Sequence, residues 1–194
     1  GQHPDPGDHG AGVVMTALGL VEGVAAAAAR GWDPISANFL QPQWVKTHWP
    51  QYEEGCTAGD RTPDPSNWRV AKSVFVADDD AMARRYALSK EGPYYFYYRS
   101  LFTKLKAAGR AALFKTDKDQ SDDSLDLDTI VRQLVICGTP ENVTDQLLAF
   151  RDETGAFGTL LYAGHDWMDR RLAIRSMELM ANKVMPAVNT AVGE

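Results

Sequence analysis

One stretch, Leu134–Trp167, constrains the fold more than any other part of the sequence. It reads as an apolar segment, a capped helix, a strand and a polar tip. Thr139 suits the N-cap and Pro140 the first helical position, where a missing N–H costs nothing, and Gly155 ends the helix. The nearly continuous apolar run at 157–162 has the length of a strand. Such a run favours burial on both faces, as in a parallel sheet covered by helices.

The polar tip of this stretch supplies the first candidate site. The predicted strand is followed by Gly164, His165, Asp166 and Trp167. Folds of the α/β class place their chemistry at the carboxyl ends of parallel strands. We therefore take His165 and Asp166 as candidate catalytic residues, for proton transfer or for orienting a substrate, and Trp167 as a pocket wall. A histidine at a strand end can equally be a hydrogen-bonded structural residue.

Composition excludes several classes of function. The chain has 194 residues and a net charge of −6, which disfavours a nucleic-acid partner. Its two cysteines, Cys56 and Cys137, lie in no metal-ligand pattern, so we expect no metal site and a reducing cytoplasm. No apolar run is long enough to span a membrane, and the Gly/Pro-rich N-terminus does not read as a signal peptide.

Strand and helix patterns alternate along the chain. Strands are expected at 13–18, 35–39, 68–77 and 159–163, and helices at 19–30, after Gln41, at 78–90, at 139–154 and at 169–185. Pro50 should kink the second helix or split it in two, and Pro186 should end the last one. The alternation predicts a parallel α/β sheet of four strands. A closed eight-stranded barrel needs about 250 residues, so this chain cannot be a complete one.

The region between the third strand and the Thr139 helix breaks this alternation. We divide the chain into a flexible N-terminal segment (1–12), an α/β unit (13–188) with an insertion at about 91–128, and a tail (189–194). The insertion opens with an aromatic cluster at 94–98. From it, Tyr94 and Tyr97 could line an apolar substrate channel, although core packing is an equally good interpretation.

Two further groups of residues could contact a ligand or serve the structure alone. Ser36 and Asn38 end the second predicted strand and could contact a cofactor or substrate, or form cap and loop hydrogen bonds. The helix start at 139–142 presents backbone N–H groups that could hold an anion, but every capped helix does the same.

Several separate motifs together resemble the bacterial luciferase-like flavin-dependent monooxygenases, in particular the limonene and alkanal monooxygenase branch. The resemblance covers roughly residues 30–188 and rests on motifs in the family's order: GWDPISANFL, WRVAKSVFVA, ICGTPENVTDQLLAFRDETGAFGTLLYAGHDW and RRLAIRSMELMANKVMP. It implies that the chain is the C-terminal half of a (β/α)₈ TIM barrel, with strands five to eight and an insertion after the third of them.

The resemblance also implies a cofactor and a reaction. The family would use reduced FMN from a separate flavin reductase, together with O₂, to oxygenate a small apolar substrate. After the family's fifth strand a hydroxyl-bearing turn helps to hold the flavin phosphate, and here Thr16 alone offers a hydroxyl. Thr16, Ser36 and Asn38 are therefore the candidate cofactor contacts.

Three functional hypotheses follow. The first is a luciferase-like monooxygenase, inactive as an isolated fragment and completed by a second copy of the chain or by an N-terminal half-barrel partner. The second is a deazaflavin-dependent oxidoreductase of the same fold. The third is a non-catalytic half-barrel that binds flavin or serves in assembly, since two open sheet edges favour association.

Overall fold

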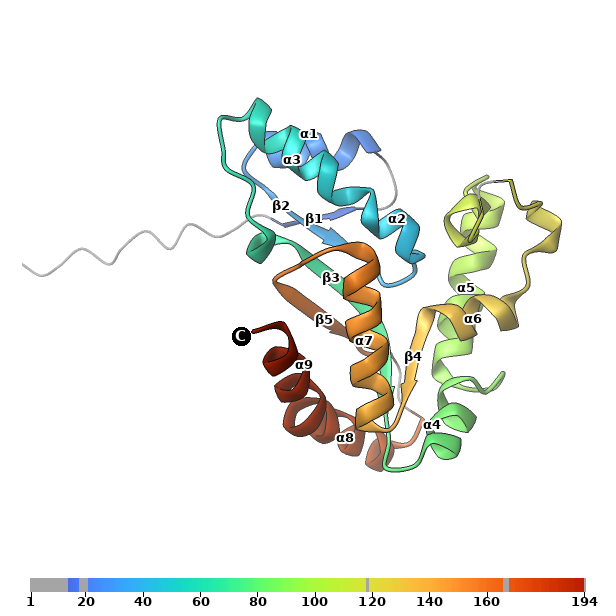
Figure 1. Cartoon of the computed structure of the whole chain (residues 1–194). Coiled ribbons are helices and arrows are strands. Elements are labelled where there is room, and N and C mark those ends of the chain that lie inside the picture. The colour runs from blue at the N-terminus through green and yellow to red at the C-terminus, as the bar shows by residue number, and fades with distance from the viewer. Residues whose placement is uncertain (1–13, 18–20, 118, 166–167, 194) are drawn as a thin grey trace, which may run out of the picture.

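Parallel strands and helices alternate along most of the chain (Figure 1). The structure is a computed structural model that describes residues 14–17, 21–117, 119–165 and 168–193. The strands in this part are β1 (Val14–Ala17), β2 (Asp33–Ser36), β3 (Arg69–Val76), β4 (Val135–Gly138) and β5 (Thr159–Ala163). The α-helices are α1 (Val21–Ala29), α2 (Pro42–Lys46), α3 (His48–Ala58), α4 (Asp80–Ala87), α5 (Pro93–Ala107), α6 (Leu127–Leu134), α7 (Pro140–Thr154), α8 (Arg170–Leu179) and α9 (Met185–Val192). Short 3₁₀ turns lie at Pro65–Asn67, Ala111–Phe114 and Asp122–Ser124, and a π-helical turn at Met180–Val184 joins α8 to α9.

β3 is the central strand of the sheet. β1 pairs with β2, β2 with the start of β3, and β5 with Arg69–Ser73 of β3, all in parallel. Arg69 is paired with both Ile35 and Thr159, so β2 and β5 lie on opposite edges of β3. The order β1-β2-β3-β5 agrees with four consecutive strands of a barrel. The predicted half (β/α)₈ barrel is thus confirmed.

β4 is a strand that the sequence did not predict. It pairs with Ser73–Val76 of β3, on the edge opposite β5 and therefore on the same edge as β2. Its four residues continue directly from the last turn of α6, so no turn signal separates them from the helix. For that reason the run at 134–137 read as an undivided apolar segment.

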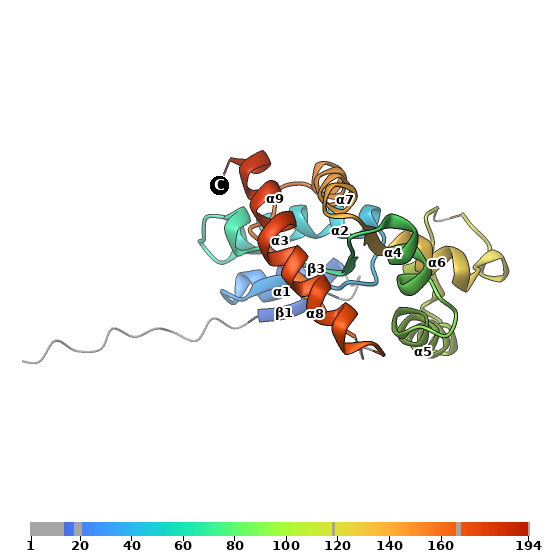
Figure 2. The same cartoon turned by 90° about the horizontal axis from the view of Figure 1, so that it is seen from below.

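The two faces of β3 pack against different layers. Val74 and Val76 face outward and pack with α7 and with the helical segment 179–184. On the inner face, the ring of Phe75 stacks on Tyr86 of α4 and meets Tyr94 of α5 edge-on. Seen from below, α5 and α7 lie on different sides of the molecule (Figure 2). The insertion therefore covers the face of β3 that points into the barrel.

Proline positions explain two differences in the helices. The second predicted helix is split into α2 and α3 at Thr47, and Pro50 lies in the first turn of α3, where its missing N–H is tolerated. Pro186 does not end the last helix. It lies in the first turn of α9, directly after the π-helical turn, and α9 continues to Val192 through most of the expected tail.

β5 is less buried than its sequence suggested. Thr159 is exposed, and Leu160–Ala163 are partly buried rather than covered on both faces. Within the described residues β5 pairs with β3 alone, which leaves its other edge without a strand. An apolar strand with one open edge is what the last strand of a half-barrel would show.

Candidate functional site

Ser73 is the centre of a buried polar network on the inner face of β3. Its side chain is fully buried, and its Oγ lies 2.9 Å from Asn38 Nδ2, 3.0 Å from the Tyr98 hydroxyl and 2.9 Å from His165 Nε2. Asn38 follows β2, His165 follows β5 and Tyr98 belongs to α5. The ends of two strands and the insertion therefore meet at one hydroxyl.

Two tyrosines of α5 hold Asn38, one through its side chain and one through its backbone. The Tyr97 hydroxyl donates to Asn38 Oδ1 at 3.0 Å, and the Tyr98 hydroxyl lies 3.2 Å from the backbone carbonyl of Asn38. Because the Asn38 amide nitrogen donates to Ser73, both ends of this amide are held. Burial raises the pKa of Tyr97 and of Tyr98, so both phenols stay protonated at neutral pH.

The imidazole of His165 packs against two tyrosine rings. Its ring centroid is 4.4 Å from that of Tyr97 and 4.8 Å from that of Tyr94, which it meets edge-on. The Tyr94 hydroxyl donates to the Val74 carbonyl at 2.7 Å, which anchors this ring to β3. His165 is partly buried, so one side of its ring reaches the surface while the other side contacts the buried network.

That surface is a pocket of about 360 Å³ between α5 and the end of β5. Its walls combine apolar side chains with a few polar groups, from Pro93, Phe96, Tyr97, Ser100, Leu101, Lys104, Gly164 and His165. Phe96 is 61% exposed at this pocket. Apolar walls with a small number of convergent polar groups are typical of sites for small organic ligands.

Ser36 belongs to a different network on the opposite face of β2. Its register partner is Val70, which shares the outward face of β3 with Val74. Ser36 Oγ accepts from Trp68 Nε1 at 2.9 Å and lies 2.8 Å from His48 Nδ1. All three side chains are buried, so no cofactor can reach this hydroxyl.

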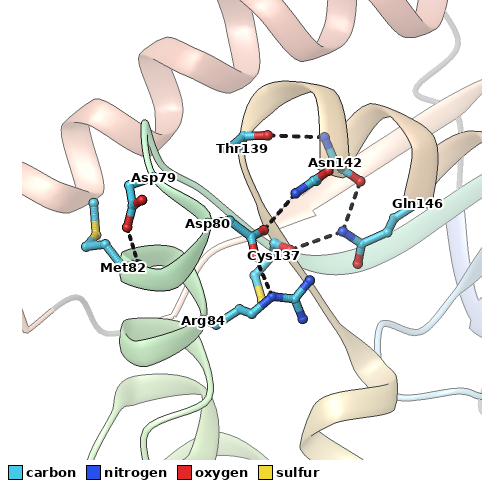
Figure 3. Close-up of polar contacts among 8 residues, drawn as sticks. All are labelled: Asp79, Asp80, Met82, Arg84, Cys137, Thr139, Asn142 and Gln146. Carbon is cyan, nitrogen blue, oxygen red and sulfur yellow. Dashed lines mark hydrogen bonds and ion pairs between the residues drawn. The ribbon is translucent and has the colours of Figure 1, made fainter.

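The start of α7 is satisfied by groups of the protein itself. Figure 3 shows Thr139 Oγ1 accepting from the Asn142 backbone N–H, while Asn142 Nδ2 donates to Asp80 at 2.8 Å. Arg84 Nε donates to the same carboxylate at 2.7 Å, and these bonds hold the pKa of Asp80 below its usual range. Gly138 has a φ of +152°, and a Cβ there would lie 2.9 Å from Asp80 Oδ1. The Asp80 carboxylate thus lies beside this helix start and is held there by the side chains of Asn142 and Arg84.

The structure brings together four of the predicted site residues: Asn38, His165, Tyr94 and Tyr97. It separates Ser36 from them. Asp166, Trp167 and the side chain of Thr16 lie outside the described residues, although β1 includes the Thr16 backbone.

Sequence reasoning missed Ser73 and Tyr98. The signal for Ser73 was present, because Lys72 and Ser73 are adjacent polar residues inside an otherwise apolar strand. Tyr98 carried no signal that distinguished it from the other aromatic residues at 94–98.

The described residues show neither a metal-ligand cluster nor a membrane-spanning helix. They contain no group of three or more histidine, cysteine, aspartate or glutamate side chains placed to hold a metal ion. None of their helices is long and apolar enough to cross a membrane.

Comparison with known proteins gives concordant matches. The model of the luciferase-like monooxygenase family matches residues 2–156. The 3,6-diketocamphane 1,6-monooxygenase of Pseudomonas putida is 32% identical over 84% of this chain and 43% of its own length. Limonene 1,2-monooxygenase of Rhodococcus erythropolis is 28% identical over 81% of this chain and 38% of its own length. The chain therefore spans less than half the length of these relatives.

A solved structure shows the same fold. It is described as a type II Baeyer–Villiger monooxygenase, the oxygenating constituent of 3,6-diketocamphane monooxygenase from the CAM plasmid of Pseudomonas putida, in complex with FMN. Its TM-score is 0.76 at 30% sequence identity, and the match covers 91% of this chain and 48% of that one.

Proposed function

The chain belongs to the luciferase-like monooxygenase family, and from this premise we propose that it forms one half of an FMN-dependent monooxygenase that acts on a small apolar substrate. The observation that carries the proposal is the pocket beside His165, where the Asn38–Ser73–Tyr97 network meets apolar walls. The site lies at the carboxyl ends of β2 and β5, where barrel enzymes hold their ligands.

The residues of this pocket fit the edge of a flavin ring or an apolar substrate lying against it. Phe96 and Leu101 offer apolar wall, while Tyr97 and His165 offer hydrogen-bonding groups. When bound, reduced FMN supplies the reaction with O₂. In our proposal His165 holds or moves a proton at one of its ring nitrogens, and Ser73 orients that ring. The apolar wall excludes water from the reacting atoms. Supply of reduced flavin by a separate reductase is part of the proposal.

The second half of the barrel completes the site in this proposal. Within the described residues β1 and β5 each pair with a single strand, and parallel sheets are normally covered and closed. We infer that the remaining strands add to these two edges, whether they come from the same polypeptide, a second copy of this chain or another protein. Location in the cytoplasm stays a prediction.

Anaerobic titration with reduced FMN tests the proposal. We expect the 194-residue chain alone to bind FMN more weakly than micromolar, because in this proposal the second half of the barrel supplies the rest of the pocket wall. Addition of the N-terminal half of the P. putida relative should tighten binding at least tenfold. The deazaflavin alternative predicts tighter binding of the deazaflavin cofactor than of FMN. A purely assembling half-barrel predicts that the two halves associate without binding either.

A further inference from the structure

Lys72 is a buried cation on the outward face of β3, away from the His165 pocket. It is 2% exposed, and its side chain faces α7, where Nζ lies 4.6 Å from the centroid of the Phe150 ring. No hydrogen bond or ion pair joins Nζ to another residue in the part of the chain that the structure describes. Lysine is almost never this deeply buried without a partner. Nζ is not among the fully enclosed side-chain atoms without a hydrogen-bond partner, so what remains exposed of it can reach a ligand.

The position of Lys72 follows from the way β3 changes partners. On one edge, β2 pairs with Ile35–Arg69 and Ser36–Val70, and β4 pairs from Ser73 onward. On that edge Ala71 and Lys72 have no strand partner among the described residues. The change from β2 to β4 therefore leaves a gap in the sheet at Lys72.

A crevice of about 250 Å³ opens at this gap. Pro42, Ile136, Ala149 and Phe150 give it apolar walls, and Lys72 and Gln133 are among its polar groups. Gln133 Oε1 accepts from Gln41 Nε2 at 2.9 Å, and Gln41 is itself buried. This bond fixes the Gln133 amide with its oxygen toward Gln41, which leaves the NH₂ group as a donor.

We propose that this crevice binds a small monocarboxylate with a short hydrocarbon tail, whose carboxylate pairs with Lys72 Nζ. The apolar walls would take the tail, and the Gln133 amide could donate to the second carboxylate oxygen. Glu153 lies on the exposed rim of the same crevice. Its negative charge disfavours dianions such as hydrogenphosphate and sets the preference for a single negative charge.

The charge state of Lys72 agrees with this assignment. Burial lowers the pKa of Lys72 to about 8, and the charge of Glu153 partly opposes that shift. At pH 7 the ammonium form therefore still dominates, and a bound carboxylate would hold it there.

Calorimetric titration of the chain with hexanoate tests the proposal, with hexanol as the uncharged probe of equal length. We expect hexanoate to bind at least tenfold more tightly than hexanol at pH 7. Lys72→Met, which keeps the length and apolar stem of the side chain, should abolish this difference. Glu153→Gln should strengthen hexanoate binding severalfold and leave hexanol unchanged.

A second variant keeps the test decisive if Lys72→Met fails to fold. Ala149→Trp fills the crevice without changing its charge and should abolish binding of both probes. Equal binding of hexanoate and hexanol to the unchanged chain would overturn the proposal. So would hexanoate binding that survives Lys72→Met, or that appears only after Glu153→Gln, since the latter would mean that Glu153 itself pairs with Lys72.

Discussion

Two histidines lie near the end of β2, and the protein uses them differently. His48 is 2% exposed on the outer side of the sheet, where Nδ1 meets Ser36. His165 is on the inner side, where Nε2 meets Ser73, and it lines a pocket. Burial lowers the pKa of His48 to about 4, so that ring is neutral and closed off. The His165 ring has access to ligand.

The difference shows that the face of the strand, rather than the strand end, decides the role of a polar residue. Ser36 and Asn38 are two positions apart, yet the chain leaves the strand after Ser36 and turns Asn38 toward Ser73. Side chains alternate between the faces of a strand, but this alternation ends where the strand ends. A strand end therefore carries both a structural network and a candidate site.

The hydrogen bonds among Ser36, His48 and Trp68 form the outer network, and those among Asn38, Ser73, Tyr97, Tyr98 and His165 form the inner network. Trp68→Ala should break the outer network, with the largest effect on stability. Trp68 is fully buried, stacks on Trp49 with ring centroids 5.8 Å apart, and donates to Ser36. The loss should be about 3–5 kcal/mol in urea unfolding. Tyr97→Ala, which removes a partly buried aromatic side chain of the inner network, should cost less than half as much. Equal losses would contradict a division into structural and ligand-facing networks.

His48 should also make the free energy of unfolding fall as the pH is lowered. The folded-state pKa of about 4 lies below the usual histidine pKa of 6.5, so the unfolded chain binds the proton first. Stability from this group is complete above pH 6.5, falls as the pH drops toward 4, and levels off below that. The loss should be about 3 kcal/mol.

His48→Asn is the control for this pH effect, because acidic residues also contribute to acid unfolding. The unfolding free energy of this variant should fall less steeply between pH 6.5 and 4 than that of the unchanged chain. An equal slope in the two proteins would show that His48 does not carry the effect.

Ser36→Ala and Tyr97→Phe each remove one hydrogen-bonding group, the first from the outer network and the second from the inner network. Ser36→Ala leaves the indole N–H of Trp68 buried without its acceptor, which should cost about 1–3 kcal/mol. Tyr97→Phe removes a donor at the pocket, where water can replace it, and should cost less than about 1 kcal/mol. Urea unfolding of both variants measures the contrast, and the reverse order would refute it.

His165→Ala should affect turnover more than folding. In a completed barrel that contains this half, we expect turnover to fall at least about tenfold, a barrier change near 1.4 kcal/mol. The unfolding free energy should stay nearly unchanged. If stability falls while turnover per folded molecule does not, His165 is a structural residue.

The sequence predicted the parts of the fold that rest on local signals. The Thr139–Pro140 start of α7 and the strand at Thr159–Ala163 are both confirmed. β4 and the continuation past Pro186 depend on pairing with β3 and on a π-helical turn, neither of which has a local signature. For the site, strand ends could be predicted, which identified Asn38 and His165. Ser73 lies inside its strand, so its role appears only when β2, β5 and α5 meet around it.

Nuclear magnetic resonance of the histidine side chains tests the central claim most directly. The chain is labelled at its four histidines and titrated under anaerobic conditions with reduced FMN to millimolar concentration, so that weak binding is detected. The signals are assigned with His165→Ala and His48→Asn. The account predicts that the ring signals of His165 shift with saturation while those of His48 stay fixed. Shifts at His48 with none at His165 would contradict it, as would a complete absence of change at both after the second half of the barrel has been added.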